Sequence, residues 1–314
     1  MSKLRGQIAG VLAGVALLAG CGSQQASRTV PVAYAGSLGY LMDQQVGPAF
    51  DHATHLVYQG RGGGALGLAQ EIRSGTVPAD VFLSIGTAPI AVLGARAPWA
   101  IGFATAPLVL AYNPKSRFAP ELEAVAAGQV PFRQLFRILA TPGFRLGRTN
   151  PNTDPQGQAF YLMVELAQRL YGLPAATVQQ VLGSPDNPAQ IFSETGILSQ
   201  LESGNLDASS AFLPEAREHH LPYILLPAAI NFSHEQDAFF YRQASLRLSD
   251  GRVVRGAPLT VDVTVVGSSA QGERFARYLL QHPEPWIRDG YRWIPFQYWG
   301  RVHAIPPTLR DVRS

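Results

Sequence analysis

Two short segments with small residues could bind an anion, because each stands between an expected strand and an expected helix. The first is Gly36-Ser37, and the second is Gly64-Ala65, at the end of the glycine-rich run Gly60–Gly64. The first turn of a helix offers unpaired N–H groups and the positive end of the helix dipole, so it can hold an oxyanion. Gly36 would let a ligand approach the backbone, and the Ser37 hydroxyl would add a donor. The same residues would also serve as plain capped turns, because serine is a good N-cap residue.

Two carboxylates could complete such a site. Asp154 lies beside Thr153 in the turn-rich stretch Asn150–Gly157, and Glu215 follows Pro214 at the start of a short expected helix. Each would also have a structural role, since aspartate caps helices and glutamate suits the first helical turn. A carboxylate beside a bound anion would repel it, unless it binds a metal centre or a proton instead.

Other chemistries fit the sequence less well. The run Gly60–Ala65 loosely matches a dinucleotide-binding fingerprint, with Asp80 about where the ribose-binding acid would stand. This run follows the second expected strand rather than the first, which disfavours that function. No phosphate-loop lysine follows it, the seven histidines show no metal-type spacing, and no Gly-x-Ser-x-Gly elbow is present. We therefore expect neither an enzyme nor a bound cofactor or metal ion.

The order of the expected elements predicts an α/β fold. Strand, helix, strand, helix and strand follow one another over residues 29–84, which is typical of a parallel sheet. These elements are expected at Thr29–Tyr34, Leu38–Phe50, His55–Tyr58, Ala65–Ser74 and Ala79–Ser84. Later strands are expected at Pro107–Tyr112, Gly143–Arg148, Tyr223–Leu226 and Ala257–Val266, and later helices at Gln158–Tyr171, Ala189–Ser203, Pro214–His220 and Glu273–Gln281.

The first residues resemble a bacterial lipoprotein signal. Lys3 and Arg5 precede the uncharged apolar run Ile8–Leu18, which is too short to cross a bilayer as a helix of about 20 residues. Leu18-Ala-Gly-Cys21 resembles the lipobox, which implies cleavage before Cys21 and lipid on its thiol. Cys21 is the only cysteine, so no internal disulfide can form. An ordinary secretory signal with a chance cysteine is the alternative.

The composition fits an exported globular body on a tether. Residues 1–20 are expected to be the signal peptide and residues 21–28 the tether, which places the protein on a membrane, facing the periplasm or the cell exterior. Hydrophobic residues make up 46% of the chain and the net charge is only +3, without a basic block. Binding of nucleic acid is therefore not expected.

Beyond the signal, the chain resembles the periplasmic tungstate/molybdate-binding proteins of ATP-binding-cassette (ABC) importers, within the type II solute-binding fold. The order and spacing of the matching stretches agree over nearly the whole mature chain. They are Ala35–Leu38, Gly64–Ile72, Pro78–Ser84, Phe103–Asn113, Gly147–Pro155, Leu201–Asp207, Leu221–Pro227 and Ile230-Asn231.

The resemblance implies a monomeric, two-lobe substrate-binding protein that closes a cleft on a tetrahedral oxyanion, molybdate or tungstate, and delivers it to a membrane permease. Residues 29–108 and 229–314 would form the first lobe and residues 109–228 the second. The implied ligand-binding residues are Gly36, Ser37, Gly64 and Ala65 from the first lobe, and Thr153, Asp154 and Glu215 from the second.

Two departures from the family pattern bear on the ligand. Relatives often have serine where this chain has Ala65, and they have glutamate in the stretch where this chain has Ala211-Phe212. In the family, two carboxylates can reach the metal atom of the oxyanion; here Asp154 would supply the first and Glu215, one helical turn further on, the second. Another anion, either sulfate-like or a small organic acid, is the alternative ligand, and an exported enzyme is the distant alternative.

Overall fold

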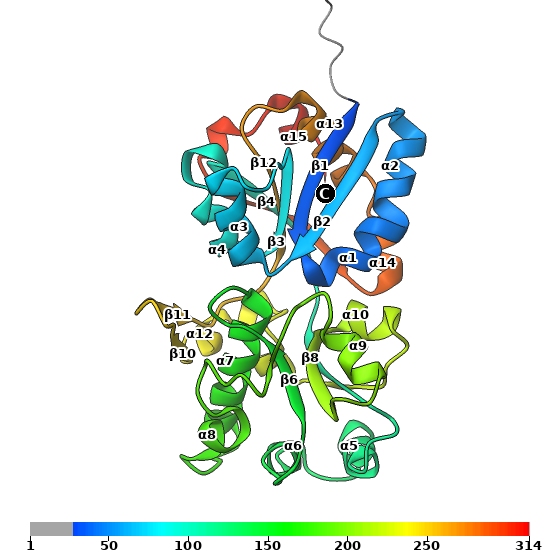
Figure 1. The fold of residues 1–314 in the computed structure, drawn as a ribbon. Helices are drawn as coiled ribbons and strands as arrows, with labels where there is room; N and C mark the ends of the chain where they lie inside the picture. The colour runs from blue at the N-terminus through cyan, green and yellow to red at the C-terminus, as the bar shows by residue number, and fades with distance from the viewer. Residues whose placement is uncertain (1–27, 314) are drawn as a thin grey trace, which may run out of the picture.

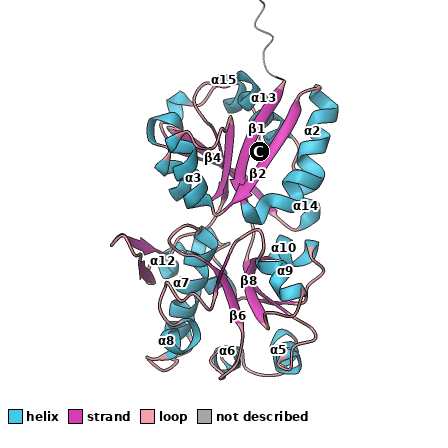
Figure 2. Ribbon diagram, viewed as in Figure 1, coloured by secondary structure: helices cyan, strands magenta, loops and turns pink. Residues whose placement is uncertain are grey.

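The computed structural model describes residues 28–313, and within this range the chain forms two lobes, each built around its own sheet (Figure 1). The sheet of the first lobe has six strands in the order β13-β4-β12-β3-β1-β2, and that of the second has five in the order β7-β6-β8-β5-β9. Helices cover the faces of both sheets (Figure 2). The predicted α/β class and two-lobe fold are confirmed.

The bounds of the elements follow the chain through both lobes. The strands are β1 (Thr29–Ala35), β2 (Val57–Gly63), β3 (Val81–Ile85), β4 (Trp99–Thr105), β5 (Leu108–Tyr112), β6 (Leu146–Thr149), β7 (Ile191–Phe192), β8 (Ala208–Phe212), β9 (Tyr223–Leu225), β10 (Ser245–Arg247), β11 (Val253–Arg255), β12 (Val261–Val265) and β13 (Arg292–Gly300). The helices are α1 (Gly39–Leu41), α2 (Gly47–Thr54), α3 (Ala65–Ser74), α4 (Ala88–Val92), α5 (Ala119–Ala126), α6 (Gln134–Leu139), α7 (Pro155–Leu170), α8 (Thr177–Leu182), α9 (Ile197–Glu202), α10 (Leu213–Glu218), α11 (Ala228–Asn231), α12 (Ala238–Tyr241), α13 (Ala270–Gln281), α14 (Glu284–Asp289) and α15 (Pro307–Arg310).

The first lobe begins with the predicted parallel unit. Strand β1 lies between β2 and β3 and is parallel to both. Helical turns run without a break from Gly36 to Thr54 and lead into β2, and α3 connects β2 to β3. The apolar residues of α3 recur at helical spacing, so Leu68, Ala69 and Ile72 share one buried face. The parallel order sends the carboxyl ends of all three strands toward the second lobe.

The glycine-rich run differs from the expected loop, because Gly60–Gly63 forms the end of the edge strand β2 and pairs with β1. Side chains of neighbouring residues lie across this strand. A Cβ atom on Gly60 would stand 2.3 Å from the Tyr58 hydroxyl, and one on Gly62 would stand 2.8 Å from a ring carbon of Tyr34. Glycine here makes room for the tyrosines rather than shaping a loop, and only Gly64 remains as the turn into α3.

A second difference from the sequence prediction lies in the second lobe. The stretch Ala189–Ser203, expected as one helix, contains the short strand β7, a turn at 193–196, and then α9. The turn is closed by hydrogen bonds from the N–H groups of Gly196 and Ile197 to the Ser193 carbonyl oxygen, at 3.1 and 3.0 Å. Serine and glycine in this run favour a turn over a continuous helix.

The chain passes between the lobes twice. The first passage is Ala106-Pro107, which joins β4 to β5. After β9, the elements from α11 to β11 still belong with the second lobe, since α11 and β10 both pack against α7 (Figure 1). The return, which the sequence analysis put at residue 229, therefore falls at residues 256–260, where the chain enters β12.

Cys21, the signal peptide and nearly all of the tether lie outside the described residues. None of the helices in the described part of the chain combines the length and the apolar character needed to cross a membrane.

Asp262 is a buried acid at the centre of the first sheet. Its side chain lies on β12 and is fully buried. Thr260 donates its hydroxyl to Oδ2 at 2.7 Å, whereas Oδ1 has no partner among residues 28–313. Gly102 on the neighbouring β4 leaves room for it, because a Cβ atom there would stand 2.8 Å from Oδ1. Burial raises the pKa of Asp262 to about 7, and the hydrogen bond from Thr260 offsets only part of this rise.

We expect this acid to make folding depend on pH. Between pH 4 and 7 the unfolded chain releases the Asp262 proton while the folded chain keeps it, so the free energy of unfolding falls by up to about 1.4 kcal/mol per pH unit. The free energy of unfolding stops falling once the pH exceeds the pKa of Asp262 in the folded protein. Asp262→Asn should flatten this part of the curve in urea unfolding measured at several pH values. An unchanged slope in the variant would contradict the assignment.

Candidate functional site

The candidate site is built from residues that follow the carboxyl ends of parallel strands. In the first lobe, Gly36 follows β1 and Gly64 follows β2. In the second lobe, Asp154, Glu194 and Glu215 come after β6, β7 and β8, which are parallel to one another. Ligands in open α/β sheets bind outside the carboxyl ends of the strands. Both lobes therefore present their binding edges to the same cleft.

Hydrogen bonds across the cleft connect both predicted helix starts to the second lobe. Gly36 donates its N–H to Oε2 of Glu194 at 2.7 Å. At the start of α3, the N–H groups of Leu66 and Gly67 donate to the Thr153 carbonyl oxygen at 2.9 and 3.2 Å. Each helix start is thus capped by an oxygen atom of the opposite lobe, as the unpaired N–H groups of a first turn require.

Ser37 lies directly in the first of these helix starts. Its side chain is only 3% exposed, and its hydroxyl has no hydrogen-bond partner of regular geometry among the described residues. The hydroxyl of Thr149, at the end of β6, is also buried without a partner of regular geometry in that part of the chain, although it lies near enough to Asp154 to oppose the rise of that acid's pKa. Because an unpaired buried hydroxyl is costly, the two groups are donors available to a ligand in the cleft.

One carboxylate oxygen of Asp154 accepts a regular hydrogen bond, and the other does not. Its Oδ1 accepts from the Gln156 N–H at 2.7 Å and so caps α7. Its Oδ2 is buried and has no regular hydrogen-bond partner among residues 28–313. A Cβ atom on Gly64 would stand 3.6 Å from this Oδ2, so the free oxygen faces the turn before α3. The capping role and the proposed ligand role are therefore compatible in one side chain.

The remaining predicted residues lie in the cleft with different roles. Thr153 is exposed and offers α3 its carbonyl oxygen, while its hydroxyl lies 3.5 Å from the Asn150 carbonyl oxygen. Ala65 is buried at the start of α3. Oε2 of Glu215 accepts from the Phe212 N–H at 2.6 Å and from Gln156 Nε2 at 2.9 Å. Glu215 is thus held by protein groups from two elements.

Glu194 is a site residue that the sequence analysis missed. Its side chain is 6% exposed and lies between the lobes, bound to Gly36. The sequence analysis assigned Ala189–Ser203 to one helix. A position inside such a helix gave no reason to expect its side chain in the cleft. The signal that could have found it is the Ser193-Glu-Thr-Gly196 run, which is a turn directly after the short β7.

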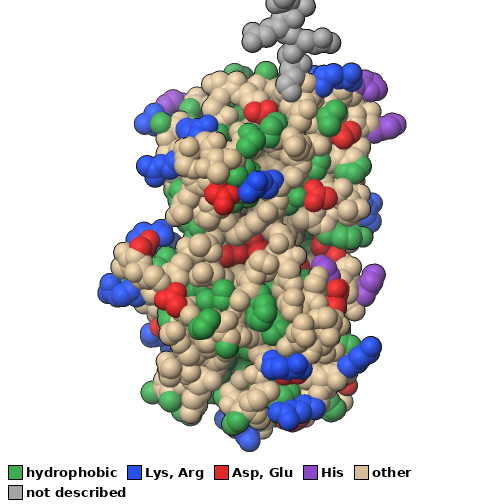
Figure 3. Space-filling view, viewed as in Figure 1, with side chains coloured by type: hydrophobic (Ala, Val, Ile, Leu, Met, Phe, Trp, Pro, Cys, Tyr) green, Lys and Arg blue, Asp and Glu red, His purple; other side chains and the backbone are tan. Residues whose placement is uncertain are grey.

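The cleft carboxylates are buried without a cation. None of the ion pairs in the described part of the chain includes Asp154, Glu194 or Glu215. Burial and the charge of Glu194 raise the pKa of Asp154 well above its usual value. Burial also raises the pKa of Glu194, although the nearby Ser37 hydroxyl and the N–H groups of Ser37 and Gly36 oppose this effect. Acidic side chains are visible where the lobes meet (Figure 3).

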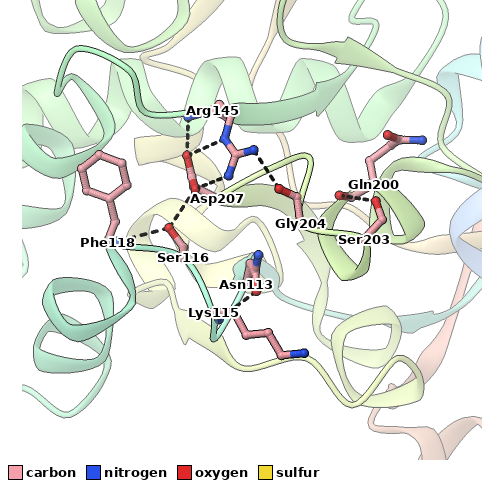
Figure 4. Close-up of polar contacts among 9 residues, drawn as sticks. All are labelled: Asn113, Lys115, Ser116, Phe118, Arg145, Gln200, Ser203, Gly204 and Asp207. Carbon is pink, nitrogen blue, oxygen red and sulfur yellow. Dashed lines mark hydrogen bonds and ion pairs between the residues drawn. The ribbon is translucent and has the colours of Figure 1, made fainter.

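Asp207, at the far end of the second lobe, shows the opposite behaviour (Figure 4). It is as deeply buried as Asp154, but Arg145 binds both of its carboxylate oxygens and Ser116 donates to one. Burial alone would raise the pKa of Asp207, yet these contacts hold it below its ordinary value. Asp207 is thus paired with a half-exposed guanidinium, whereas no ion pair within residues 28–313 includes a cleft carboxylate.

A fourth acid lies at the edge of the cleft. Glu218 is in the last turn of α10, and Asp289 of the first lobe lies close enough to act on its charge. Burial, with a smaller effect of Asp289, raises the pKa of Glu218 to about 8. Within residues 28–313, no group of three or more acidic, histidine or cysteine side chains is arranged to hold a metal ion.

Two cavities adjoin Glu194. One of about 110 Å³ is lined by Gly36, Ser37 and Glu215, and one of about 330 Å³ is lined by Gly64, Thr149 and Asp154. Glu194 and Thr195 line both. The buried polar atoms described above therefore line two spaces of the size of a small ligand. Glu194 separates these two spaces.

A two-lobe α/β body with hydrogen-bond donors and free acceptors facing a shared cleft defines a solute-binding protein. A family model for bacterial extracellular solute-binding proteins matches residues 30–292. The chain belongs to this family.

Individual relatives agree with the family assignment. The chain is 30% identical over 259 residues to a Haloferax volcanii protein provisionally named an ABC transporter molybdenum-binding protein, covering 82% of this chain and 79% of the relative. It is 28% identical to the molybdate/tungstate-binding protein WtpA of Pyrococcus abyssi, over 57% of this chain and 56% of the relative. The solved periplasmic molybdate-binding protein of Azotobacter vinelandii shares the fold, with a TM-score of 0.57 and 17% identity, over 84% of this chain and 98% of that one.

We expect Glu215 to stabilise the fold even without ligand. Glu215→Ala would leave the Phe212 N–H and Gln156 Nε2 unpaired in a buried place, and should lower the free energy of unfolding by about 1–3 kcal/mol. Glu215→Gln keeps the acceptor oxygen and should cost much less. Urea unfolding of the ligand-free protein measures both. Equal stability of the alanine variant and the parent would show that these hydrogen bonds contribute nothing.

Proposed function

We propose that this protein is the extracytoplasmic substrate-binding lipoprotein of an ABC importer, and that it captures a tetrahedral oxyanion, molybdate or tungstate, for delivery to the permease. In this proposal the protein acts as a monomer without enzymatic activity. It is anchored through lipid on Cys21 after removal of residues 1–20. The names of its relatives support the transporter and the ligand, and the lipobox-like sequence supports the anchor.

The observation that carries the ligand assignment is the set of unpaired buried atoms on both sides of the cleft. Ser37 Oγ and the N–H of Gly36 can donate to oxygens of the anion from the smaller cavity, and Thr149 Oγ1 can donate from the larger one, once Glu194 no longer divides them. Asp154 Oδ2 is an acceptor, so it cannot bind the oxygens of a fully ionised oxyanion. It can reach the metal atom of molybdate or tungstate, or carry a proton.

The proposed mechanism is closure of the lobes around the anion. The ligand would touch Gly36 and Ser37 from the first lobe and Asp154 from the second, so it favours the state in which the lobes meet. The two chain passages between the lobes, at 106–107 and 256–260, are the places where backbone rotation would allow closure.

A thermal unfolding screen tests the ligand. At a free concentration 100 times the Kd, an anion that binds only the folded state adds about 2.7 kcal/mol of stability and raises the Tm. We expect this shift with sodium molybdate and sodium tungstate. Sulfate, phosphate and small organic acids are compared at the same ionic strength. A shift with one of these and none with molybdate or tungstate would replace the ligand assignment and keep the binding function.

Variants of the two lobes should separate the contributions of backbone and side chains. Ser37→Ala removes one neutral donor while Gly36 remains, so we expect molybdate to bind about five to ten times more weakly, as for the loss of one hydrogen bond. Asp154→Asn retains an oxygen that can cap α7 but cannot act as an anionic ligand of a metal atom. Isothermal titration should show a larger loss in this variant. Unchanged affinity would reject direct contact between Asp154 and the metal atom.

A further inference from the structure

The Glu194 carboxylate has the position and the bonding that a bound oxyanion would need. Its Oε2 lies 2.7 Å from the Gly36 nitrogen, at the beginning of the helical segment that follows β1. The Ser37 hydroxyl and N–H lie beside it and favour its charged form, and the side chain is 94% buried. A carboxylate is itself an oxyanion, and its lone pairs accept from the same N–H and O–H donors as the oxygens of molybdate.

Two anions cannot share these donors. The N–H of Gly36 is satisfied by Glu194, and no lysine or arginine within residues 28–313 forms an ion pair with the carboxylate. An oxyanion placed against Gly36 and Ser37 would therefore meet an uncompensated negative charge within a few ångströms, in a place that water does not screen. The ligand can enter only if Glu194 withdraws.

The backbone allows Glu194 to withdraw. The residue stands in the turn at 193–196, between the two-residue strand β7 and the start of α9, rather than inside a regular element. It belongs to the second lobe, while its donor belongs to the first, so opening of the lobes separates them. Glu194 also lines both cavities, and removal of its carboxylate would join the space beside Ser37 to the space beside Asp154.

We propose that Glu194 is an internal competitor of the ligand: its carboxylate occupies the anion position between Gly36 and Ser37 when the site is empty, and the incoming oxyanion must displace it. This inference rests on the proposed function. It adds that Glu194 sets how tightly an anion must bind the donors in order to enter the site. Anions that bind the neutral donors weakly fail to displace Glu194, whereas one that also engages Asp154 succeeds. Glu194 thus contributes to specificity without contacting the ligand.

A different role for Glu194 predicts the opposite result. If the contact with Gly36 only held the closed lobes together while the ligand sat elsewhere, removal of the carboxylate would weaken binding. The sign of the change in affinity therefore decides between competition and closure.

The experiment is isothermal titration of the purified full-length protein with sodium molybdate and sodium tungstate. Glu194→Gln keeps the size of the side chain but removes its charge. We expect the Kd to fall about tenfold, which corresponds to a parent protein in which Glu194 leaves the anion position roughly a tenth of the time. Glu194→Ala should bind at least as tightly. Glu121→Gln removes one charge from the exposed first turn of α5 and should match the parent.

Chemical replacement gives a second measurement that a purely structural role would not change. In Glu194→Ala, acetate can take the place of the missing carboxylate, so millimolar sodium acetate should weaken molybdate binding relative to sodium chloride. In the parent protein, whose own carboxylate fills the place, acetate should have little effect.

The outcomes separate the inference from the proposed function. If the parent binds and the Glu194 variants bind equally or more weakly, the inference is overturned and the function stands. If only the variants bind, the competitor role is supported in its strongest form. If neither the parent nor the variants bind molybdate or tungstate, both the ligand assignment and the inference are rejected.

Discussion

The burial of carboxylates between two lobes, without an ion pair among residues 28–313, is the constraint on which the site depends. A buried charge must be hydrogen-bonded or must hold a proton. Around Glu194 this need is met by backbone N–H groups at the end of β1, and around Asp154 by the first turn of α7. These donors exist because parallel strands end, and helical turns begin, at the same edge of each sheet. The fold therefore supplies the backbone donors of the proposed anion site, and side chains only modify them.

Recognition by neutral donors has a consequence for selectivity. A lysine or arginine in the cleft would attract any anion, and it would also neutralise Asp154 and Glu194, as Arg145 does for Asp207. Without such a cation, an anion must exchange the hydrogen bonds of its hydration shell for those of well-placed N–H and O–H groups. It must also bind where the acids do not repel it. In the proposed function, the acids act against anions that cannot bind them, so charge in this cleft would exclude ligands rather than attract them.

Sequence patterns predicted the parts of the structure in which one local rule decides the outcome. The β1 strand and the cap of α7 by Asp154 follow from burial and capping preferences, and they lie where expected, whereas Gly36-Ser37, considered as a capped turn, lies inside a helical segment that Ser37 does not cap. Two features were missed for different reasons. The run Gly60–Gly63 is strand because it pairs with the distant β1, where Tyr34 takes up the space that the glycines leave. Glu194 enters the site because a local turn, closed on the Ser193 carbonyl oxygen, interrupts an apparently helical stretch.

The two acids that the sequence singled out differ in what they can offer a ligand. Glu215 Oε2 already accepts two hydrogen bonds, and breaking them would leave Gln156 and the N–H of Phe212 unpaired in a buried place. Asp154 can reach a ligand through Oδ2 while Oδ1 goes on capping α7. A metal atom entering this cleft would thus find one ready carboxylate rather than two. The strand β8, before α10, ends here in Ala211-Phe212 and so offers no carboxylate at that point. Under the proposed function, Asp154 is therefore the acid that meets the metal atom, whereas Glu194 only competes for the donors at Gly36 and Ser37.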